Sequence, residues 1–324
     1  MTNTTTQLPG IPLGSGGPIV GAQGLGCMGM SEFYGDADPL ESRATLDLAL
    51  ELGVTLFDTA DMYGVGENES FLSPFLSANR DRVFIATKFG FLRTPETPDD
   101  WSVTNDPSHI RRAIEGSLAR LGVGTIDLYY MHRRDPSIPL AESVGAMSDL
   151  VHEGKVRSLG LCEVSAEELT EAHAIHPIAA LQSEWSVFSR DIEADVAPAA
   201  ARLGVTVVPY APLGRGLLTG RLTLAQDDAR RNFPRFSDAN VDTNLHLVGV
   251  VRSIADRRGV SPAQVALAWL YGRAEVFNLT VLPIPGTRKR RRLRENVAAA
   301  SLVLSDEETT ELDQLASQVQ GERA

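Results

Sequence analysis

The segment LFDTADMYG (residues 56–64) passes from an apolar run of strand length directly into polar residues, with Asp58 at the end of the run and Tyr63 in the turn that follows. Two later segments repeat this pattern: VFIATKFG (83–90) carries Lys88 and IDLYYMHRRDP (126–136) carries His132. Short apolar, β-branched runs of this kind are typical of buried strands. The pattern predicts that Asp58, Tyr63, Lys88 and His132 lie together at one end of a parallel sheet.

Apolar runs of strand length alternate with amphipathic stretches along the chain. This alternation is typical of repeated strand–helix units. We expect strands near 23–28 and at 54–58, 83–88, 126–132, 156–162, 179–184, 205–210 and 279–286. We expect helices at 41–52, 107–121, 139–153, 165–174, 192–203, 244–258, 262–272 and 306–318. Asp106, Ser165 and Ser261 stand at N-cap positions of three of these helices.

Eight strands with eight helices predict an α/β fold, a (β/α)8 TIM barrel. We expect residues 1–324 to form a single domain with an N-terminal β-hairpin and a C-terminal helix, residues 1–18 being a partly ordered extension. A doubly wound open sheet is the alternative, but no GxGxxG follows the first strand. Polar residues also end many strands, as expected around the mouth of a barrel.

Composition narrows the class of protein. The 324 residues are 43% apolar and carry a formal charge of −12, which argues against a nucleic-acid binder that works through overall charge. Only Cys27 and Cys162 are present, as expected of a cytoplasmic protein in a reducing compartment. We expect no signal peptide, no membrane span and no metal site.

Four further segments combine with those above into a recognisable set: GLGCMGMS, GLCEVSAE, QSEWSVFSRD and PYAPLGRGLLTG. Together with FDTADMYGVGENE, ATKFG, DLYYMHRRDP and LPIPGTRKRRRLREN, they resemble the motifs of the aldo-keto reductase family over roughly residues 20–300. The resemblance is to soluble reductases with short C-terminal tails. It implies NADPH-dependent reduction of a small aldehyde or ketone.

The chemistry of the four opening residues agrees with this resemblance. Reduction of a carbonyl requires a proton for the developing alkoxide, and Tyr63 is the expected acid. A phenol is a weak acid at neutral pH, so Lys88 is expected to lower the pKa of Tyr63, and Asp58 to keep Lys88 charged and aimed. His132 is expected to hydrogen-bond the substrate carbonyl and orient it.

The resemblance also implies a set of cofactor-binding residues. Gln182, Cys162 and Glu163 would contact the nicotinamide carboxamide, Trp185 would stack on the ring, and the glycine loop after strand 205–210 would hold the pyrophosphate. A packed cysteine is the alternative for Cys162. The full expected set is Met28, Cys162, Glu163, Gln182, Trp185, Tyr210, Pro212, Leu213, Gly214, Arg215, Gly216, Gly286, Thr287, Arg288, Arg292, Glu295 and Asn296.

A basic run at 288–294 follows Pro285-Gly286-Thr287 in an otherwise acidic chain. Such runs occur in nucleic-acid binders and localisation signals, but here the run follows a predicted strand and begins a helix, which is a phosphate-binding arrangement. Guanidinium groups fit the 2′-phosphate of NADP, and we assign Arg288 and Arg292 to it. By resemblance, Glu295 and Asn296 lie at the adenine edge.

Two loops remain open in function. The polar loop 90–106 is expected to form one wall of the substrate pocket, with Trp101 and Tyr34 as contacts, and the loop 222–243 could close over the cofactor. Two other functions stay possible: an NADP-binding regulatory or redox-sensing module with little turnover, and a barrel hydrolase or isomerase that pairs Asp58 with Asp61. The sequence does not indicate an oligomeric state.

Overall fold

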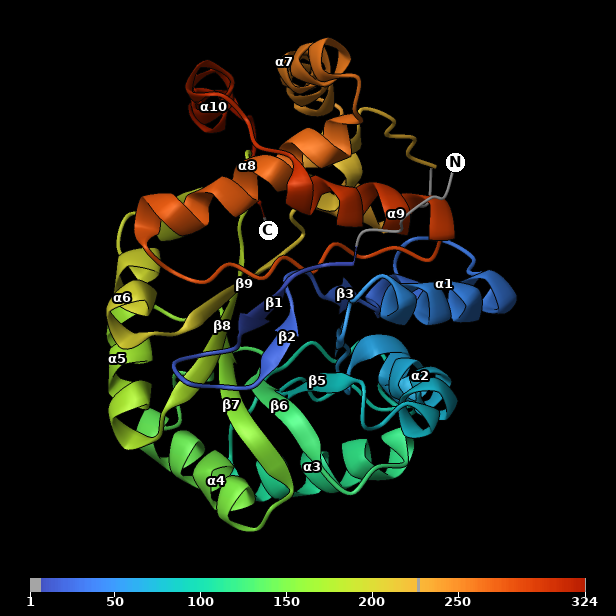
Figure 1. Ribbon diagram of the computed structural model, residues 1–324. Coiled ribbons are helices and arrows are strands. Elements are labelled where there is room, and N and C mark those ends of the chain that lie inside the picture. The colour runs from blue at the N-terminus through green and yellow to red at the C-terminus, as the bar shows by residue number, and fades with distance from the viewer. Residues whose placement is uncertain (1–6, 226–227, 324) are drawn as a thin grey trace.

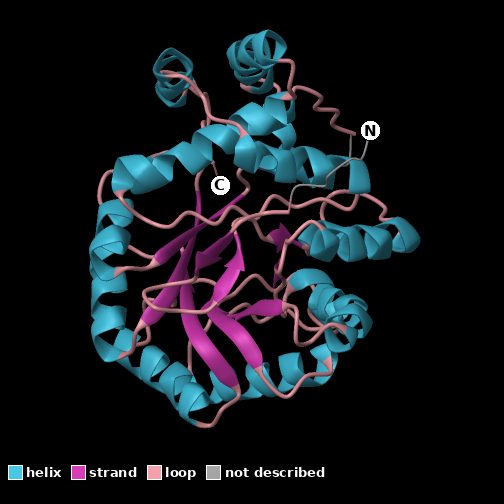
Figure 2. Cartoon of the chain, viewed as in Figure 1, coloured by secondary structure: helices cyan, strands magenta, loops and turns pink. Residues whose placement is uncertain are grey.

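The computed structural model describes residues 7–225 and 228–323, in which parallel strands form an inner barrel and helices an outer ring (Figures 1 and 2). The predicted α/β barrel is confirmed. The strands pair in chain order in one seven-stranded sheet: β3 (Leu25–Gly26), β4 (Leu56–Asp58), β5 (Phe84–Phe89), β6 (Ile126–Met131), β7 (Val156–Cys162), β8 (Ile178–Glu184) and β9 (Thr206–Tyr210).

The predicted eighth strand, 279–286, closes the barrel without forming a regular strand. It makes only an isolated parallel bridge, Val207 to Val281. Pro283 and Pro285 have no N–H to donate, which prevents a continuous ladder. Backbone hydrogen bonds nevertheless tie the segment to both neighbouring strands: Val207 N to Thr280 O (2.9 Å), Leu282 N to Val207 O (2.9 Å), Ile284 N to Pro209 O (3.1 Å) and Gly24 N to Pro283 O (3.0 Å).

The helices that alternate with the barrel strands are α1 (Pro39–Glu51), α2 (Glu67–Ala78), α3 (Pro107–Leu121), α4 (Leu140–His152), α5 (Ala166–Ile175), α6 (Val196–Leu203), α8 (Pro262–Phe277) and α9 (Arg290–Ala298). Two more, α7 (Val241–Arg258) and α10 (Asp306–Asp313), lie outside that ring (Figure 1). The expected side-chain caps at Asp106, Ser165 and Ser261 are present. Within the described residues, no helix combines the length and the apolar character needed to cross a membrane.

Short 3-10 helices fill several connections: η1 (Met28–Met30), η2 (Tyr63–Gly66), η3 (Asp191–Glu193), η4 (Gly214–Thr219), η5 (Ala229–Asn232), η6 (Pro234–Phe236), η7 (Ala299–Ser301) and η8 (Ala316–Gln318). The helix predicted at 192–203 is therefore split into η3 and α6, and the one at 306–318 into α10 and η8.

The sequence predicted eight helices, but they are not the eight that form the ring. The eight predicted ranges do not include α2 or α9, although a helix start was expected after Thr287; both are ring helices, whereas α7 and α10 are additions to the ring. α2 begins at Gly66 without a side-chain cap and contains Pro74, so it lacks the usual signals. α9 buries only Leu293, Asn296 and Val297 against the protein, too few apolar positions to mark a stripe.

Alternation along the strands decides which side chains enter the barrel. An inner core contains Leu56, Phe84, Leu128, Ala180 and Val208, while their sequence neighbours pack outward against the helices. Side chains alternate with period two along a strand. Asp58, Lys88, Tyr130, His132, Gln182 and Tyr210 therefore continue the inward series toward the carboxyl ends of the strands.

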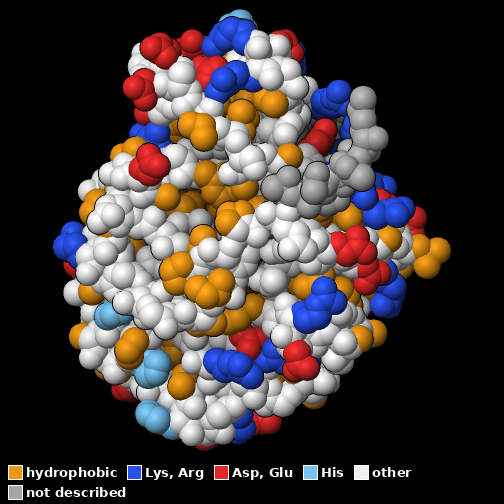
Figure 3. All heavy atoms as spheres, in the orientation of Figure 1, with side chains coloured by type: hydrophobic (Ala, Val, Ile, Leu, Met, Phe, Trp, Pro, Cys, Tyr) orange, Lys and Arg blue, Asp and Glu red, His pale blue; other side chains and the backbone are white. Residues whose placement is uncertain are grey.

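The opposite end of the barrel is covered by the expected N-terminal hairpin, in which β1 (Gly10–Pro12) pairs with β2 (Ile19–Gly21). Gly14 N donates to Thr206 Oγ1 (2.8 Å) and Gly21 N to Thr55 Oγ1 (2.9 Å), at or next to the starts of β9 and β4. The hairpin sequence has no charged residue. Seen from this side in Figure 3, the middle of the molecule is mostly uncharged, and charged side chains lie around it.

Barrel closure depends on a close backbone approach at Gly26. A Cβ atom there would lie 2.9 Å from the carbonyl oxygen of Ile284, in the closing segment. We predict that Gly26→Ala lowers the free energy of unfolding by about 1–3 kcal/mol because the closing segment must shift.

Gly272→Ala is the matched control for that substitution. Gly272 is exposed within α8, with no neighbouring heavy atom within 4 Å of an added Cβ, so alanine should stabilise by about 0.5–1 kcal/mol. Urea unfolding of the three proteins measures both effects. Unchanged stability of Gly26→Ala would contradict the tight closure.

Candidate active site

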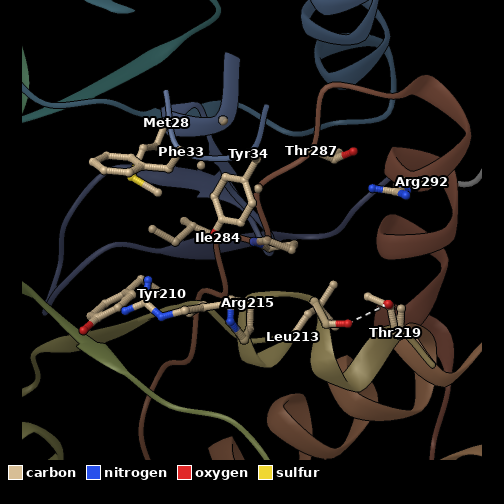
Figure 4. Close-up of a pocket in the computed structure, with 18 of the residues that line it drawn as sticks. Met28, Phe33, Tyr34, Tyr210, Leu213, Arg215, Thr219, Ile284, Thr287 and Arg292 are labelled. Carbon is tan, nitrogen blue, oxygen red and sulfur yellow. Dashed lines mark hydrogen bonds between the residues drawn. The ribbon is translucent and has the colours of Figure 1, made fainter. Parts of the chain in front are cut away.

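A cavity of about 950 Å³ opens at the carboxyl ends of the barrel strands. Figure 4 shows two facing sides: Met28, Phe33 and Tyr34 come from the segment after β3, and Tyr210, Leu213, Arg215 and Thr219 come from the end of β9 and the loop after it. Asp58, Tyr63 and His132 also line this cavity, and Lys88 lies directly behind them. The structure thus brings the four residues of the opening motifs together.

The Lys88 ammonium is the centre of this group. Its Nζ donates to Asp58 Oδ1 (2.5 Å), to the Thr59 carbonyl oxygen (2.8 Å) and to Tyr63 Oη (3.1 Å). An ammonium has three donors, so every one is used. The Lys88 side chain is fully buried, and these bonds fix the Tyr63 hydroxyl at the wall of the cavity.

Burial and pairing set the protonation states. Burial alone would lower the pKa of Lys88, but Asp58 and Tyr63 raise it above its ordinary value, so Lys88 remains an ammonium. Burial raises the pKa of Asp58, and Lys88 opposes that rise.

The expected effect on Tyr63 needs a correction. Lys88 does act to lower the pKa of Tyr63, but burial outweighs it, so the pKa lies above the ordinary value for tyrosine. Tyr63 therefore holds its proton at neutral pH, which is the form that can donate.

His132 stands beside Tyr63, with ring centroids 5.9 Å apart and planes at 83°. The Phe91 ring lies on another side, 5.1 Å away. Burial lowers the pKa of His132 well below its ordinary value, and the charges of Lys88 and Arg133 lower it further. Its Nδ1 is buried without a hydrogen-bond partner among the described residues. A neutral imidazole in this position has one N–H to offer to a bound oxygen.

The two aspartates proposed for hydrolysis do not share a site. Asp58 accepts from Lys88 and, through Oδ2, from Gln182 Nε2 (2.8 Å). Asp61 does not line the cavity, and burial and the nearby Glu69 raise its pKa well above the ordinary value. Asp58 and Asp61 therefore do not form the paired carboxylates of a hydrolase. The described residues also contain no cluster of three His, Cys, Asp or Glu suited to a metal ion.

Most of the expected cofactor residues do line the cavity: Met28, Gln182, Tyr210, Pro212, Leu213, Arg215, Gly216, Gly286, Thr287, Arg288, Arg292, Glu295 and Asn296. Tyr34 and Trp101, expected in the substrate pocket, line it as well. Four expected residues do not: Cys162, Glu163, Trp185 and Gly214. Cys162 packs in the inner core, and burial raises its pKa to about 12.

Trp185 was expected at the cavity but lies between the barrel and helix α8. It is fully buried, packs edge-on against Phe277 of α8 and donates from Nε1 to Glu193 (3.0 Å). Gln182 points inward, and a residue three positions further along a strand points the other way. Tyr210, which points inward, provides an aromatic side chain at the cavity (Figure 4).

Arg288 differs from expectation in its contacts. Its guanidinium donates to the backbone carbonyls of Gly29 (2.9 Å), Gly35 (2.7 Å) and Tyr34 (2.7 Å) and so fixes the loop after β3. The Arg292 side chain makes no ion pair or hydrogen bond with the described residues and lies with Thr287 at one end of the cavity (Figure 4). Arg292 is therefore the better candidate for a phosphate.

Several cavity residues were missed from sequence. Phe33 and Phe91 lie next to recognised motifs but carry no polar signal, and Arg133 is hidden in the HRRDP segment. Arg230, from the loop expected to close over the cofactor, bonds Arg215 O (3.0 Å) and stacks 5.6 Å from the Tyr34 ring. Contacts between such distant segments leave no pattern in the local sequence.

Comparisons with known proteins agree with this geometry. A sequence profile described as the aldo/keto reductase family matches residues 23–317. Glycerol dehydrogenase from Gluconobacter oxydans is 30% identical with a TM-score of 0.82, over 98% of this chain and 97% of that one. An aldo-keto reductase from Bacillus halodurans, in its holo form, is 25% identical with a TM-score of 0.76, over 98% of each chain. One from Klebsiella pneumoniae, solved with NADP and acetate, is 29% identical with a TM-score of 0.72, over 94% and 96%.

The burial of His132 predicts the pH range in which its ring is neutral. Because burial lowers the pKa of His132 well below 6.5, the ring should stay neutral as the pH is raised from 6.5 to 8. Long-range nitrogen–proton NMR spectra, assigned with His132→Gln, should show no shift of its ring nitrogens over this range. A titration with a midpoint at or above 6.5 would contradict the assignment.

Proposed function

Because the chain belongs to the aldo/keto reductase family, we propose that it reduces aldehydes or ketones to alcohols with NADPH, with Tyr63 as the proton donor. The observation that carries this proposal is the saturated Lys88 ammonium, which holds the phenol hydroxyl of Tyr63 against the cavity. The cofactor assignment also draws on the Klebsiella pneumoniae relative, which was solved with NADP.

The cavity fits an extended dinucleotide. The loop after β9 contributes Leu213, Arg215 and Gly216 for the pyrophosphate, and Arg215 and Gly216 both have positive φ, which turns the backbone sharply there. Arg292 and Thr287 would hold the 2′-phosphate, and Asn296 and Glu295 the adenine. When bound, NADPH supplies the hydride that is added to the carbonyl carbon.

The protein's own groups then handle the proton and the oxygen. His132, neutral and beside Tyr63, donates a hydrogen bond that orients the carbonyl oxygen. Tyr63 transfers its proton to that oxygen as negative charge develops there, and the resulting phenolate is stabilised by Lys88 until solvent restores the proton. Asp58 keeps Lys88 charged, because an unpaired buried ammonium would tend to lose its proton.

Gln182 acts as a positioning residue. Its amide N–H holds the second oxygen of Asp58, so the carboxylate cannot turn away from Lys88. Gln182 also lines the cavity, so it can contact the nicotinamide end of the cofactor through its remaining groups. A family member without turnover would have no use for this charged assembly, which favours the enzyme over a binding module.

Tyr63→Phe removes only the acidic hydroxyl. We predict that kcat for a simple aromatic aldehyde falls by about 10²- to 10⁴-fold, because the alkoxide loses its proton donor. NADPH affinity, measured by fluorescence titration, should stay within about threefold, since phenylalanine preserves the ring packing. Turnover equal to wild type would refute Tyr63 as the acid.

The two arginines near Thr287 should behave differently. Arg292→Ala should weaken NADPH by about tenfold or more with little effect on NADH, because only NADPH has the 2′-phosphate. Arg288→Ala should weaken both cofactors, since it frees the loop 29–35. Calorimetric titration of both variants with both cofactors separates these roles. An equal loss of NADPH and NADH in Arg292→Ala would contradict the phosphate assignment.

A further inference from the structure

Arg133 places a positive charge beside the reacting end of the cavity. It directly follows His132, lines the cavity and is only partly exposed. Its Nη1 donates to the His132 carbonyl oxygen (2.8 Å), and its other donors have no partner in the described part of the chain. Arg133 follows β6, which is paired with β7 in the barrel sheet.

The nearby carboxylates are already matched with other arginines. Glu163 receives two bonds from Arg323 (2.8 and 2.7 Å). Glu184 lies 3.5 Å from Arg235 and 3.6 Å from Arg215 and also accepts from Ser189 (2.7 Å). No ion pair involves Arg133 among the residues that the structure describes. A partly buried guanidinium without a counter-charge is costly and indicates an anion that the protein itself does not supply.

The cofactor does not supply that anion either. Under the proposed function, the loop after β9 and Arg292 would hold its phosphates, and its nicotinamide ring would lie against Tyr63 and His132. A nicotinamide ring carries a neutral carboxamide and no phosphate. The remaining charge at Arg133 therefore faces the substrate.

Aromatic side chains form much of the wall at the substrate end. Trp101 packs against Phe91 and Phe33, with ring centroids 6.0 and 6.2 Å away, and Phe91 in turn contacts the His132 ring. Flat rings pack well against such walls. The pocket thus combines an apolar surface suited to an aryl group with one unmatched cation.

We propose that Arg133 is a specificity-determining residue that selects aromatic aldehydes or ketones bearing a carboxylate, which its guanidinium binds while Tyr63 and His132 hold the carbonyl oxygen. This inference rests on the proposed reductase function. The planar guanidinium can hold a carboxylate through two parallel hydrogen bonds. A neutral analogue of the same shape leaves the guanidinium unmatched and binds more weakly.

The test compares 2-, 3- and 4-carboxybenzaldehyde with their methyl esters, which present the charge at three distances from the aldehyde. For each isomer, kcat/KM of the acid is divided by kcat/KM of the ester, so effects common to both substrates cancel. For at least one isomer, Arg133→Leu should lower this ratio by about tenfold or more. Arg133→Lys keeps the positive charge but not the planar guanidinium, so its acid-to-ester ratio should lie between those of the wild type and Arg133→Leu.

Arg134→Leu is the matched control. Arg134 is the next residue in sequence, pairs with Glu168 at 3.6 Å and does not line the cavity. Its loss should leave all three ratios unchanged. In the wild-type protein, KM for the preferred acid should also rise with added potassium chloride while KM for its ester stays constant, a readout that needs no variant.

Two results would overturn the inference. If the esters are reduced and Arg133→Leu leaves every acid-to-ester ratio unchanged, Arg133 does not recognise a carboxylate, although the reductase function stands. If the wild-type protein with NADPH reduces neither acids nor esters, the proposed function itself fails, and the inference fails with it.

Discussion

The buried ion pair between Lys88 and Asp58 is the interaction on which the rest of the site depends. An ammonium inside a barrel is stable only if each of its donors finds an acceptor, and here the acceptors come from β4, from the residue after it and from the Tyr63 turn. This requirement fixes the register of β4 against β5 at the mouth of the barrel and the position of the phenol. The charge of Lys88 therefore shapes the local structure and, under the proposed function, supports proton donation by Tyr63.

The barrel provides this pair with a dry, inward-facing position. Side chains alternate with period two, so Leu56 and, two residues later, Asp58 both point into the barrel from β4. On β5, Phe84, Ala86 and Lys88 point inward in the same way. The hairpin covers the amino ends of the strands, and the cavity lies at their carboxyl ends. The closing segment 279–286 is not paired regularly, because its prolines lack an N–H. It leads to Thr287 and Arg292, which line one end of the cavity.

Much of this could be predicted from sequence, because local signals carry it. Apolar runs and caps indicated a barrel, and the strand-end positions of Asp58, Lys88 and His132 indicated their convergence. Failures occurred where a non-local contact decides. Trp185 has the right chemistry for stacking, but it follows the last residue of β8 and packs outward against α8. Arg288 has the right charge for phosphate, but backbone carbonyls of the loop after β3 occupy it. The pKa of Tyr63 depends on burial, which no sequence pattern reports.

The charged side chains around the cavity differ in whether they have partners within the protein. Lys88, Glu163 and Glu184 each have partners within the protein, whereas we propose that Arg133 binds part of the substrate and Arg292 part of the cofactor. The central claim remains that the charge of Lys88 makes Tyr63 an effective donor. Single-turnover reduction of an aromatic aldehyde by NADPH-loaded Lys88→Met tests it most directly. The account predicts a rate at least about 10²-fold below wild type with NADPH affinity preserved. A wild-type rate in that variant would contradict it.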